Sequence, residues 1–118
     1  MIIIHEKSGQ ILGRKIKKAN TFGSRLLGFM FKKSIEPYDG LFLAWNNSVH
    51  NCFVQFSLDI IFINKNNEIV KIIRNFRPWR FSRIYFRARH TIEFISGTIP
   101  DSIVVGDKLV INQEKQDF

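Results

Sequence analysis

The sequence has little cysteine, proline or glycine. Among its 118 residues are one cysteine (Cys52), three prolines and seven glycines. A single cysteine excludes an internal disulfide and a zinc site of the CxxC type, and it suits a reducing compartment. The scarcity of proline and glycine excludes collagen-like and low-complexity chains. Because 45% of the residues are hydrophobic, the chain can bury a core, and we expect a single domain over residues 1–118 with a frayed tail at residues 113–118.

Long hydrophobic runs are absent as well. The apolar start, Met1–Ile4, is too short for a signal sequence and is followed at once by His5 and Glu6. The longest segment without formal charge, Gly40–Leu58, is interrupted by asparagines, serines and a glutamine, which do not suit a membrane-spanning helix. These absences predict a soluble protein located in the cytoplasm.

Acidic residues are missing between Ile69 and Ile92, in a chain whose net charge is +8. Such a local excess of positive charge predicts attraction to polyanions. Arg80 lies beside Pro78 and Trp79, and we expect it to be partly buried and paired with a carboxylate, Asp59 or Glu93. The other arginines of this stretch are expected to form a solvated, polyanion-binding face: Arg74, Arg77, Arg83, Arg87 and Arg89.

Aromatic residues are interleaved with these cations. They are Phe76, Trp79, Phe81, Tyr85 and Phe86. Grooves that bind single-stranded nucleic acid combine such rings, which stack on bases, with cations, which contact phosphates. The alternative is that the rings belong to the core and that arginine stems lie over them. We favour the core interpretation at this point, because no RNP, KH or helix-turn-helix signature accompanies the pattern.

Short β-branched and apolar runs bounded by turn residues predict a series of strands. Only the spacing of Phe22, Leu26, Phe29 and Met30 suits a helix, which we place near residues 21–30. The fold expected is therefore mainly β, a single-domain antiparallel β sandwich or partly closed barrel with one short α-helix. The predicted strands are Ile2–His5, Ile11–Lys18, Leu41–Trp45, Val49–Phe56, Leu58–Ile63, Ile69–Ile73, Thr91–Ile95 and Lys108–Asn112.

Four residues are candidates for chemistry: His50, Cys52, Asp59 and Glu93. On a strand, His50 and Cys52 would point to one face, as a nucleophile (Cys52) and its base (His50) would require. The favoured interpretation is nevertheless that Cys52 is buried and inert. Asp59 opens an apolar strand and needs a partner if it is buried. We expect it to accept backbone amides or to pair with His50 or an arginine; a ligand site with His50 and Glu93 is the alternative. Glu93 is expected to pair with Arg80 or Arg25.

No metal or cofactor is expected. The histidines show neither HxH nor HExxH spacing, and the glycines are not arranged as a phosphate-binding loop. A paired-carboxylate site of the glycosidase kind would need Asp59 and Glu93 at a set separation, which a sequence does not give. No catalytic constellation is recognisable, so we incline against an enzyme.

The central segment Ser48–Ile63 resembles the signature of the DUF192 family, in which a strand led by His or Trp is followed by a short turn and a Leu/Ile-Asp-Ile/Val strand. Val54 and Ser57 stand where family members often have Met and Pro. The resemblance implies a compact, mainly β, jelly-roll-like domain and carries no enzyme activity. Other segments agree in order: Arg25–Met30, Gly40–Leu43, Pro78–Arg80, Ile92–Gly97 and Val105–Asp107.

Two functions follow as hypotheses. The first is a non-enzymatic ligand- or protein-binding accessory domain, with a pocket for a small-molecule or peptide ligand. The alternative is binding of a polyanion or single-stranded nucleic acid through the basic, aromatic-rich segment 71–90. The pocket residues expected for the first function are His50, Asp59, Trp79, Arg80 and Glu93.

Overall fold

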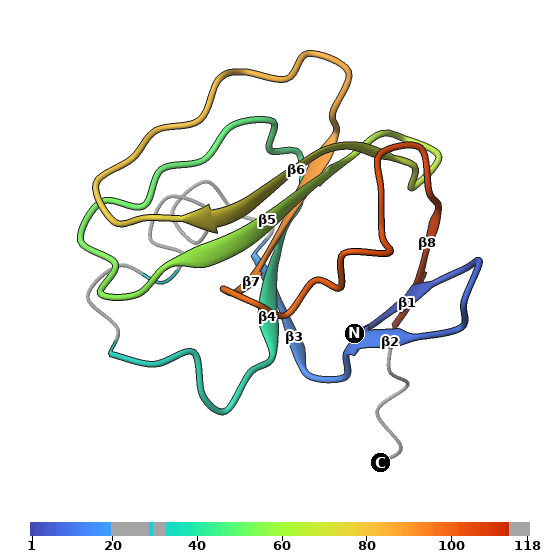
Figure 1. Cartoon of the computed structure of the whole chain (residues 1–118), viewed down its shortest axis with the longest axis horizontal. Helices are drawn as coiled ribbons and strands as arrows, with labels where there is room; N and C mark the ends of the chain where they lie inside the picture. The colour runs from blue at the N-terminus through green and yellow to red at the C-terminus, as the bar shows by residue number, and fades with distance from the viewer. Residues whose placement is uncertain (20–28, 30–32, 114–118) are drawn as a thin grey trace.

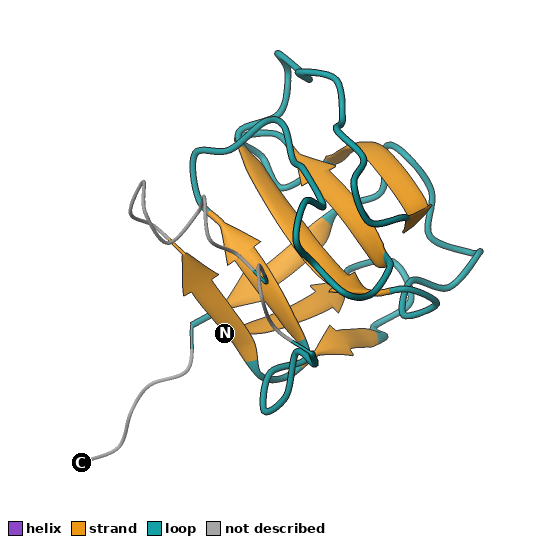
Figure 2. Ribbon diagram, turned by 90° about the vertical axis from the view of Figure 1, so that its left-hand side faces the viewer, coloured by secondary structure: helices purple, strands orange, loops and turns teal. Residues whose placement is uncertain are grey.

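The computed structural model describes residues 1–19, 29 and 33–113, and these form two β-sheets (Figure 1). The small sheet has the order β2-β1-β8, and the large sheet has the order β3-β4-β7-β5-β6. Figures 1 and 2 show the small sheet packed across one face of the large one. The strands are β1 (Ile2–His5), β2 (Ile11–Gly13), β3 (Ile16–Ala19), β4 (Gly40–Leu43), β5 (Leu58–Ile63), β6 (Ile69–Phe76), β7 (His90–Ile95) and β8 (Leu109–Asn112).

The hairpin of β5 and β6 turns through polar residues. The strands are antiparallel, and Ile63 lies opposite Ile69. In the turn, Asn64 Oδ1 accepts the backbone N–H groups of Asn66 and Glu68 at 2.9 and 3.0 Å. Asn67 adopts a φ of 62°, in the left-handed region that asparagine tolerates better than most residues. The hairpin predicted from the sequence is confirmed.

Strands β5 and β7 form the centre of the large sheet. Each has a strand on both sides: β5 pairs with β6 and β7, and β7 pairs with β4 and β5, all antiparallel. Every residue of β5 is buried. Its sequence is apolar apart from Asp59, as expected for a strand covered on both faces. Among the described strands, only β3 and β4 run parallel.

The face of the large sheet that meets the small sheet holds one hydrophobic core. Phe42, Ile61 and Phe94 are among its buried side chains from the large sheet. The small sheet contributes Ile3 and Leu109, and the loop that follows β7 contributes further isoleucines. This sandwich of two sheets agrees with the predicted mainly β fold.

Two connecting segments cover much of the opposite face of the large sheet, where Phe29 and Ile35 from the connection between β3 and β4 also join the core. The first arm, residues 44–57, joins β4 to β5, and the second arm, residues 77–89, joins β6 to β7. Val49 and Val54 of the first arm and Ala88 of the second arm enter a second core together with Ile60 and Phe62 of β5. The arms therefore act as the outer layer on this side.

Asp59 is a buried carboxylate with three backbone donors. Its Oδ1 accepts the N–H of Asn75 at 3.0 Å, and its Oδ2 accepts those of Gly97 and Ile99 at 2.9 and 3.2 Å. These bonds tie the start of β5 to the end of β6 and to the turn after β7. Of the roles predicted for Asp59, acceptance of backbone amides is confirmed, and pairing with His50 is wrong.

The sequence prediction differs from the structure in two described segments. The segment Val49–Phe56 is not a strand but part of the first arm, with an isolated bridge at His50, because Phe53 has a φ of 60° that breaks an extended ladder. The predicted strand Ile11–Lys18 is divided into β2 and β3, which belong to different sheets.

Other predictions concern residues outside the described part. The short helix near residues 21–30 lies outside it except for Phe29, and so does the tail from residue 114 onward. Within the described ranges there is no helix, and the sheets do not close into a barrel. A helix long and apolar enough to cross a membrane is likewise not found among these residues.

Replacement of Asp59 tests its role in the fold. Asp59→Ala leaves three N–H donors without their acceptor, and we expect the free energy of unfolding to fall by about 1–3 kcal/mol. Asp59→Asn keeps one acceptor oxygen and should lose less. Urea unfolding followed by circular dichroism measures both variants. An Asp59→Ala protein as stable as the wild type would contradict this role.

Candidate functional site

The two arms are hydrogen-bonded to each other through their main chains. The N–H of Asn51 donates to Arg80 O at 2.9 Å, Trp79 N–H donates to Asn51 O at 2.8 Å, and Ser82 N–H donates to Val49 O at 2.8 Å. Two more bonds of this kind follow toward β7. The arms accordingly run side by side as the green and the gold-to-orange traces of Figure 1. Main-chain pairing holds them in place without a regular ladder.

Large aromatic side chains are exposed on the arms. The exposed fractions are 66% for Trp45, 60% for Trp79, 76% for Phe81 and 86% for Phe86. A single exposed ring is ordinary, but a group of them on two neighbouring segments marks an interaction surface. The favoured prediction that the aromatics of this stretch belong to the core is therefore wrong for Trp79, Phe81 and Phe86.

Three of the arm aromatics have a left-handed backbone. The φ angles are 56° at Trp45, 60° at Phe53 and 64° at Trp79. Bulky residues rarely adopt this conformation, and each instance costs about 1–3 kcal/mol. The rings of Phe53 and Trp79 meet edge to face with centroids 4.6 Å apart. Backbone conformations of this kind concentrate at ligand-binding segments.

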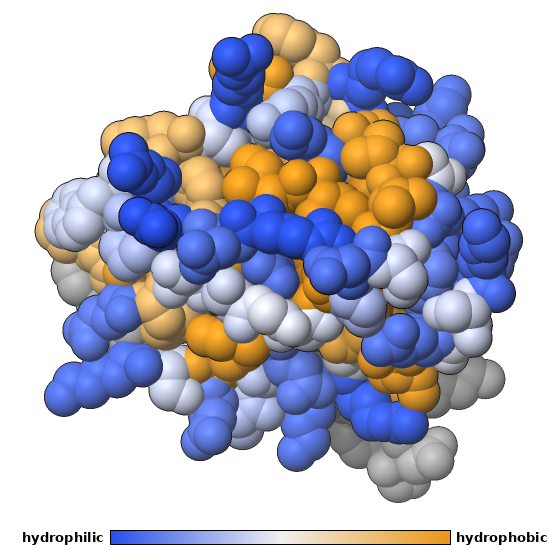
Figure 3. Space-filling view, in the orientation of Figure 1, coloured by the Kyte–Doolittle hydropathy of each residue, from blue (hydrophilic) through white to orange (hydrophobic). Residues whose placement is uncertain are grey.

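Exposed arginines alternate with these rings along the second arm. None of them forms an ion pair with another described residue. Figure 3 shows apolar and strongly hydrophilic side chains interspersed along the upper edge of the molecule, where the second arm runs in Figure 1. The arginines are Arg77, Arg80, Arg83, Arg87 and Arg89.

Arg74 does not belong to this arginine face. Its guanidinium donates to the carbonyl oxygens of Pro100 and Ile103 at 2.9 and 3.1 Å and lies 3.6 Å from Asp101. The side chain thus fastens β6 to the loop after β7. Its inclusion in the predicted polyanion-binding face needs correction, because its donors are already engaged by the protein.

Arg80 also differs from the prediction. It is exposed and pairs with neither Asp59 nor Glu93. The physical reason is that Asp59 is satisfied by three backbone N–H groups and needs no cation. The structural contribution of Arg80 comes from its carbonyl group, which accepts the N–H of Asn51.

The five predicted pocket residues do not meet in one place. In the pairing of β5 with β7, Ile60 lies opposite Glu93 and Asp59 lies opposite Phe94. Glu93 therefore faces the arms, whereas Asp59 faces the small sheet. His50, Trp79 and Arg80 lie on the arms themselves, where His50 forms an isolated bridge with Phe81. A single pocket around His50, Asp59, Trp79, Arg80 and Glu93 is therefore not formed.

His50 and Cys52 are not arranged as a base and a nucleophile. The Nδ1 atom of His50 accepts the backbone N–H of Cys52 at 3.2 Å. The centroid of the imidazole ring lies 6.4 Å from the centroid of the Phe81 phenyl ring. Because this segment is not a strand, the argument that placed the two side chains on one face does not apply. Cys52 is half-buried with a free thiol. Within the described ranges no group of three or more acidic, cysteine or histidine side chains is placed to hold a metal.

Glu93 is buried in the centre of the large sheet. It accepts no hydrogen bond and forms no ion pair within the part of the chain that the structure describes. Burial raises the pKa of Glu93 to about 8 because a low-dielectric surrounding disfavours the charged form. The carboxyl group is therefore mostly protonated at neutral pH. The predicted pair with Arg80 is absent, and Arg25 lies outside the described residues.

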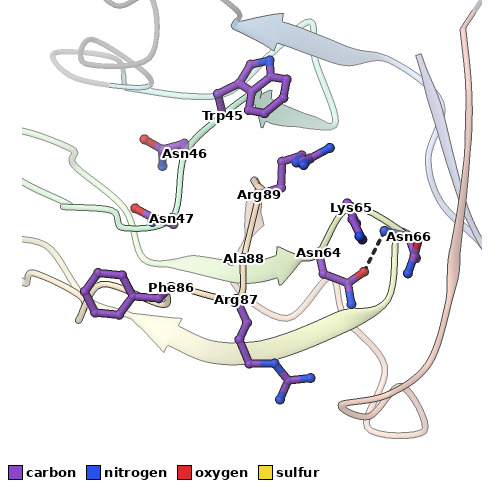
Figure 4. A pocket seen from close by; sticks show the side chains of 10 residues that line it. All are labelled: Trp45, Asn46, Asn47, Asn64, Lys65, Asn66, Phe86, Arg87, Ala88 and Arg89. Carbon is purple, nitrogen blue, oxygen red and sulfur yellow. Dashed lines mark hydrogen bonds between the residues drawn. The ribbon is translucent and has the colours of Figure 1, made fainter.

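An open hollow of about 520 Å³ lies where the first arm, the second arm and the β5–β6 turn come together (Figure 4). Its lining carries three cations and no carboxylate among the described residues. From the sequence, Asn46 and Asn47 indicate only a turn, so their place in this hollow was not predicted. The lining residues are Trp45, Asn46, Asn47, Asn64, Lys65, Asn66, Phe86, Arg87, Ala88 and Arg89.

His90 positions Trp45 at this hollow. The N–H of Trp45 donates to His90 Nδ1 at 2.9 Å, and the two rings meet edge to face with centroids 5.6 Å apart. Burial, together with the positive charges of Arg89 and Lys18, lowers the pKa of His90. The imidazole is therefore neutral near pH 7, which leaves Nδ1 able to accept this bond.

Sequence comparison assigns the family. The model of the DUF192 family, described as "Uncharacterized ACR", matches residues 3–111. The chain belongs to the DUF192 family. This DUF192 member is 32% identical over 117 residues to the UPF0127 protein PF1050 of Pyrococcus furiosus, covering 94% of this chain and 98% of that one. It is also 32% identical over 115 residues to the UPF0127 protein PH1112 of Pyrococcus horikoshii, covering 92% and 96%. The family predicted from the sequence is confirmed.

Two crystal structures share the fold of this DUF192 member. One is from Sinorhizobium meliloti and is described as a "putative transcription regulator"; it has a TM-score of 0.76 and 21% identity and covers 92% of this chain and 89% of that one. The other is a protein of unknown function from Novosphingobium aromaticivorans, with a TM-score of 0.69, 19% identity and coverage of 94% and 93%. At this identity the likeness concerns the fold alone.

The buried carboxyl group of Glu93 predicts a stability that depends on pH. An unfolded chain releases the proton of this group near its ordinary pKa of 4.5, whereas the folded protein holds it up to about pH 8. Between these values the folded state binds more protons, so this group lowers the free energy of unfolding as the pH rises. Glu93→Gln removes the effect. The variant should gain stability relative to the wild type between pH 4.5 and pH 8.

Denaturant unfolding of both proteins at pH 4.5, 6 and 8 measures this difference. Glu6→Gln, at an exposed position after β1, is the control and should show no comparable trend. A stability difference between Glu93→Gln and the wild type that is the same at all three pH values would contradict the prediction.

Proposed function

We propose that this protein is a binding domain and that its ligand is single-stranded nucleic acid, bound on the outer surface of the two arms. The observation that carries the proposal is the alternation, along the second arm, of exposed aromatic rings and arginines that form no ion pair with a described residue. Rings stack on bases, and guanidinium groups contact phosphates, in most proteins that bind single strands. The cytoplasm is the location that this proposal favours.

The electrostatics of the arms support a polyanionic ligand. No acidic residue occurs between Ile69 and Ile92, so β6 and the second arm present cations alone. Five exposed arginines on one segment repel one another in the free protein, and a chain of phosphates relieves that repulsion. Their planar guanidinium groups also match phosphate geometry.

The arm aromatics favour a single strand over a duplex. Stacking needs bases whose faces are accessible, and in a duplex those faces are covered by neighbouring base pairs. Trp79 is supported from one side by the ring of Phe53, and its left-handed backbone fixes the direction in which it leaves the chain. A ring held in this way loses little conformational entropy when a base stacks on it.

The proposal retains a binding role but moves the site. Of the pocket residues expected from the sequence, His50, Trp79 and Arg80 remain on the proposed surface. Asp59 and Glu93 do not contribute to it, since Asp59 faces the small sheet and Glu93 is buried on the opposite face of the large sheet. The exposed rings and cations would also suit an anionic membrane surface, which the experiment below distinguishes.

Charge reversal on the second arm tests the proposal. In Arg83→Glu/Arg87→Glu, both changes are at exposed positions, so the free energy of unfolding should stay within about 0.5 kcal/mol of the wild-type value. Affinity for a fluorescein-labelled single-stranded 20-mer, measured by anisotropy, should fall. The slope of log K against log salt should become shallower by about 1.4 if each arginine contacts one phosphate.

The matched control is Lys7→Glu/Lys108→Glu, which changes the net charge equally at exposed positions next to the small sheet. It should bind the strand nearly as well as the wild type. An equal loss of affinity in the control would mean that the effect comes from the net charge of the protein and not from the second arm. Stronger binding to vesicles of phosphatidylcholine and phosphatidylserine than to the strand would assign the surface to membranes and contradict the proposal.

A further inference from the structure

The hollow at the end of the arms differs chemically from the rest of the arm surface. Besides aromatic rings and cations, it contains side-chain amides from two separate segments, the first arm and the β5–β6 turn. Its volume of about 520 Å³ falls in the range of small-molecule sites. In Figure 4 Arg89 lies at the centre of the lining, with Trp45 above it, Asn47 on one side and Lys65 on the other. A surface that only attracted phosphates would not need amides here.

Trp45 offers a fixed stacking platform in this hollow. Its backbone is held by the bond to His90, and the neighbouring Asn46 is held by a bond from its N–H to Arg89 O at 2.9 Å. The guanidinium of Arg89 lies 4.7 Å from the centroid of the indole ring. Most of the indole surface nevertheless remains exposed. The ring is therefore oriented before any ligand arrives.

Two of the four asparagines are available to a ligand. The side chain of Asn64 is already hydrogen-bonded within the β5–β6 turn. The amide nitrogen of Asn46 donates to Ser48 O at 2.6 Å. Among the described residues, no hydrogen bond involves the side chains of Asn47 and Asn66. A free carboxamide presents an acceptor and a donor side by side, which is the pattern that the edge of a nucleobase complements.

Cations at the rim of the hollow add to the indole ring and the free amides. Lys65 and Arg87 are exposed and form no ion pair with a described residue. Lys65 lies on the β5–β6 turn and Arg87 on the second arm. A ligand with a planar heterocycle, hydrogen-bonding edges and a phosphate would engage the indole, the amides and the cations together. A lipid headgroup or free phosphate would engage only the cations.

From this arrangement we infer that the hollow is a nucleotide subsite, in which one unpaired base stacks on Trp45 and phosphates contact Lys65 or Arg87. Asn47 and Asn66 lie on the two sides of Arg89 in Figure 4, so they read the edges of that base and of its neighbour in the strand. The inference rests on the proposed function and deepens it. It makes this end of the arms the part that distinguishes one base from another, while the remaining rings and arginines bind any strand.

Mononucleotides test the subsite directly. Adenosine 5′-monophosphate and ribose 5-phosphate carry the same phosphate, and calorimetric titration of each into the full chain compares them. We expect the nucleotide to bind at least about fivefold more tightly than ribose 5-phosphate, because stacking of a base on one aromatic ring contributes at least this factor to affinity. Trp45→Leu should remove most of this difference and leave ribose 5-phosphate unchanged. Equal binding of the two ligands to the wild type would overturn the inference.

Homopolymeric strands test base reading. The wild type should bind labelled 10-mers of deoxyadenylate, deoxycytidylate and thymidylate with different affinities, and Asn47→Ala/Asn66→Ala should bring the three together. Both changes remove side chains without hydrogen bonds to described residues, so folding is preserved. The matched control, Trp79→Leu, should weaken all three strands equally and keep their order.

The outcomes separate this inference from the proposed function. If the strands bind in the manner expected of the arginine face but the Trp45 and asparagine variants behave as the wild type does, the subsite is wrong and the proposed function stands. If adenosine 5′-monophosphate binds through Trp45 but no strand binds, the subsite is supported and the proposed function fails.

Discussion

Burial of β5 and β7 on both faces is the constraint on which the rest of the structure depends. These strands place apolar side chains alternately toward the small sheet and toward the arms, so each face needs its own cover. On one face the cover is a second sheet. On the other, two irregular segments provide much of the cover, together with Phe29 and Ile35. These segments must satisfy their own backbone groups because they add no strand to a ladder. Their mutual main-chain hydrogen bonds follow from that requirement.

The central sheet also handles its buried polar groups in different ways. Asp59 has backbone donors for both carboxylate oxygens, whereas Glu93 remains neutral without a described partner. Asn51 lies between these extremes: its amide nitrogen donates to the carbonyl oxygens of Phe56 and Phe76, and its Oδ1 lacks a partner among the described residues. Asp59 and Asn51 join the sheet to its connecting segments, whereas Glu93 lies within the sheet. Polar burial therefore specifies how the loops attach, while the apolar side chains supply most of the stability.

Local patterns made part of this structure predictable. The β5–β6 hairpin follows from two apolar runs and an asparagine-rich turn, and the role of Asp59 follows from the cost of burying an unpaired carboxylate. The first arm was not predictable in the same way, because Val49–Phe56 has strand-like composition but turns at Cys52 and Phe53, where Phe53 has a left-handed backbone. The exposed rings of the second arm have the composition of a core strand as well. Whether such a segment is buried depends on how much of the sheet face remains to be covered, a property of the whole fold. The hollow near Trp45 combines three segments distant in sequence, so spacing alone contained no sign of it.

The main-chain pairing of the arms has a consequence for how this family can change over time. Because the carbonyl and N–H groups bear the connection between the arms, the outward-facing side chains are largely free of any part in it. A substitution at Phe81 or Arg83 alters what the surface offers without loosening the scaffold, much as the loops of an antibody domain vary on a constant framework. Members of one family could then share this architecture and yet prefer different ligands. Under such divergence, the pairing pattern of the arms would persist longer than the identity of the residues displayed on them.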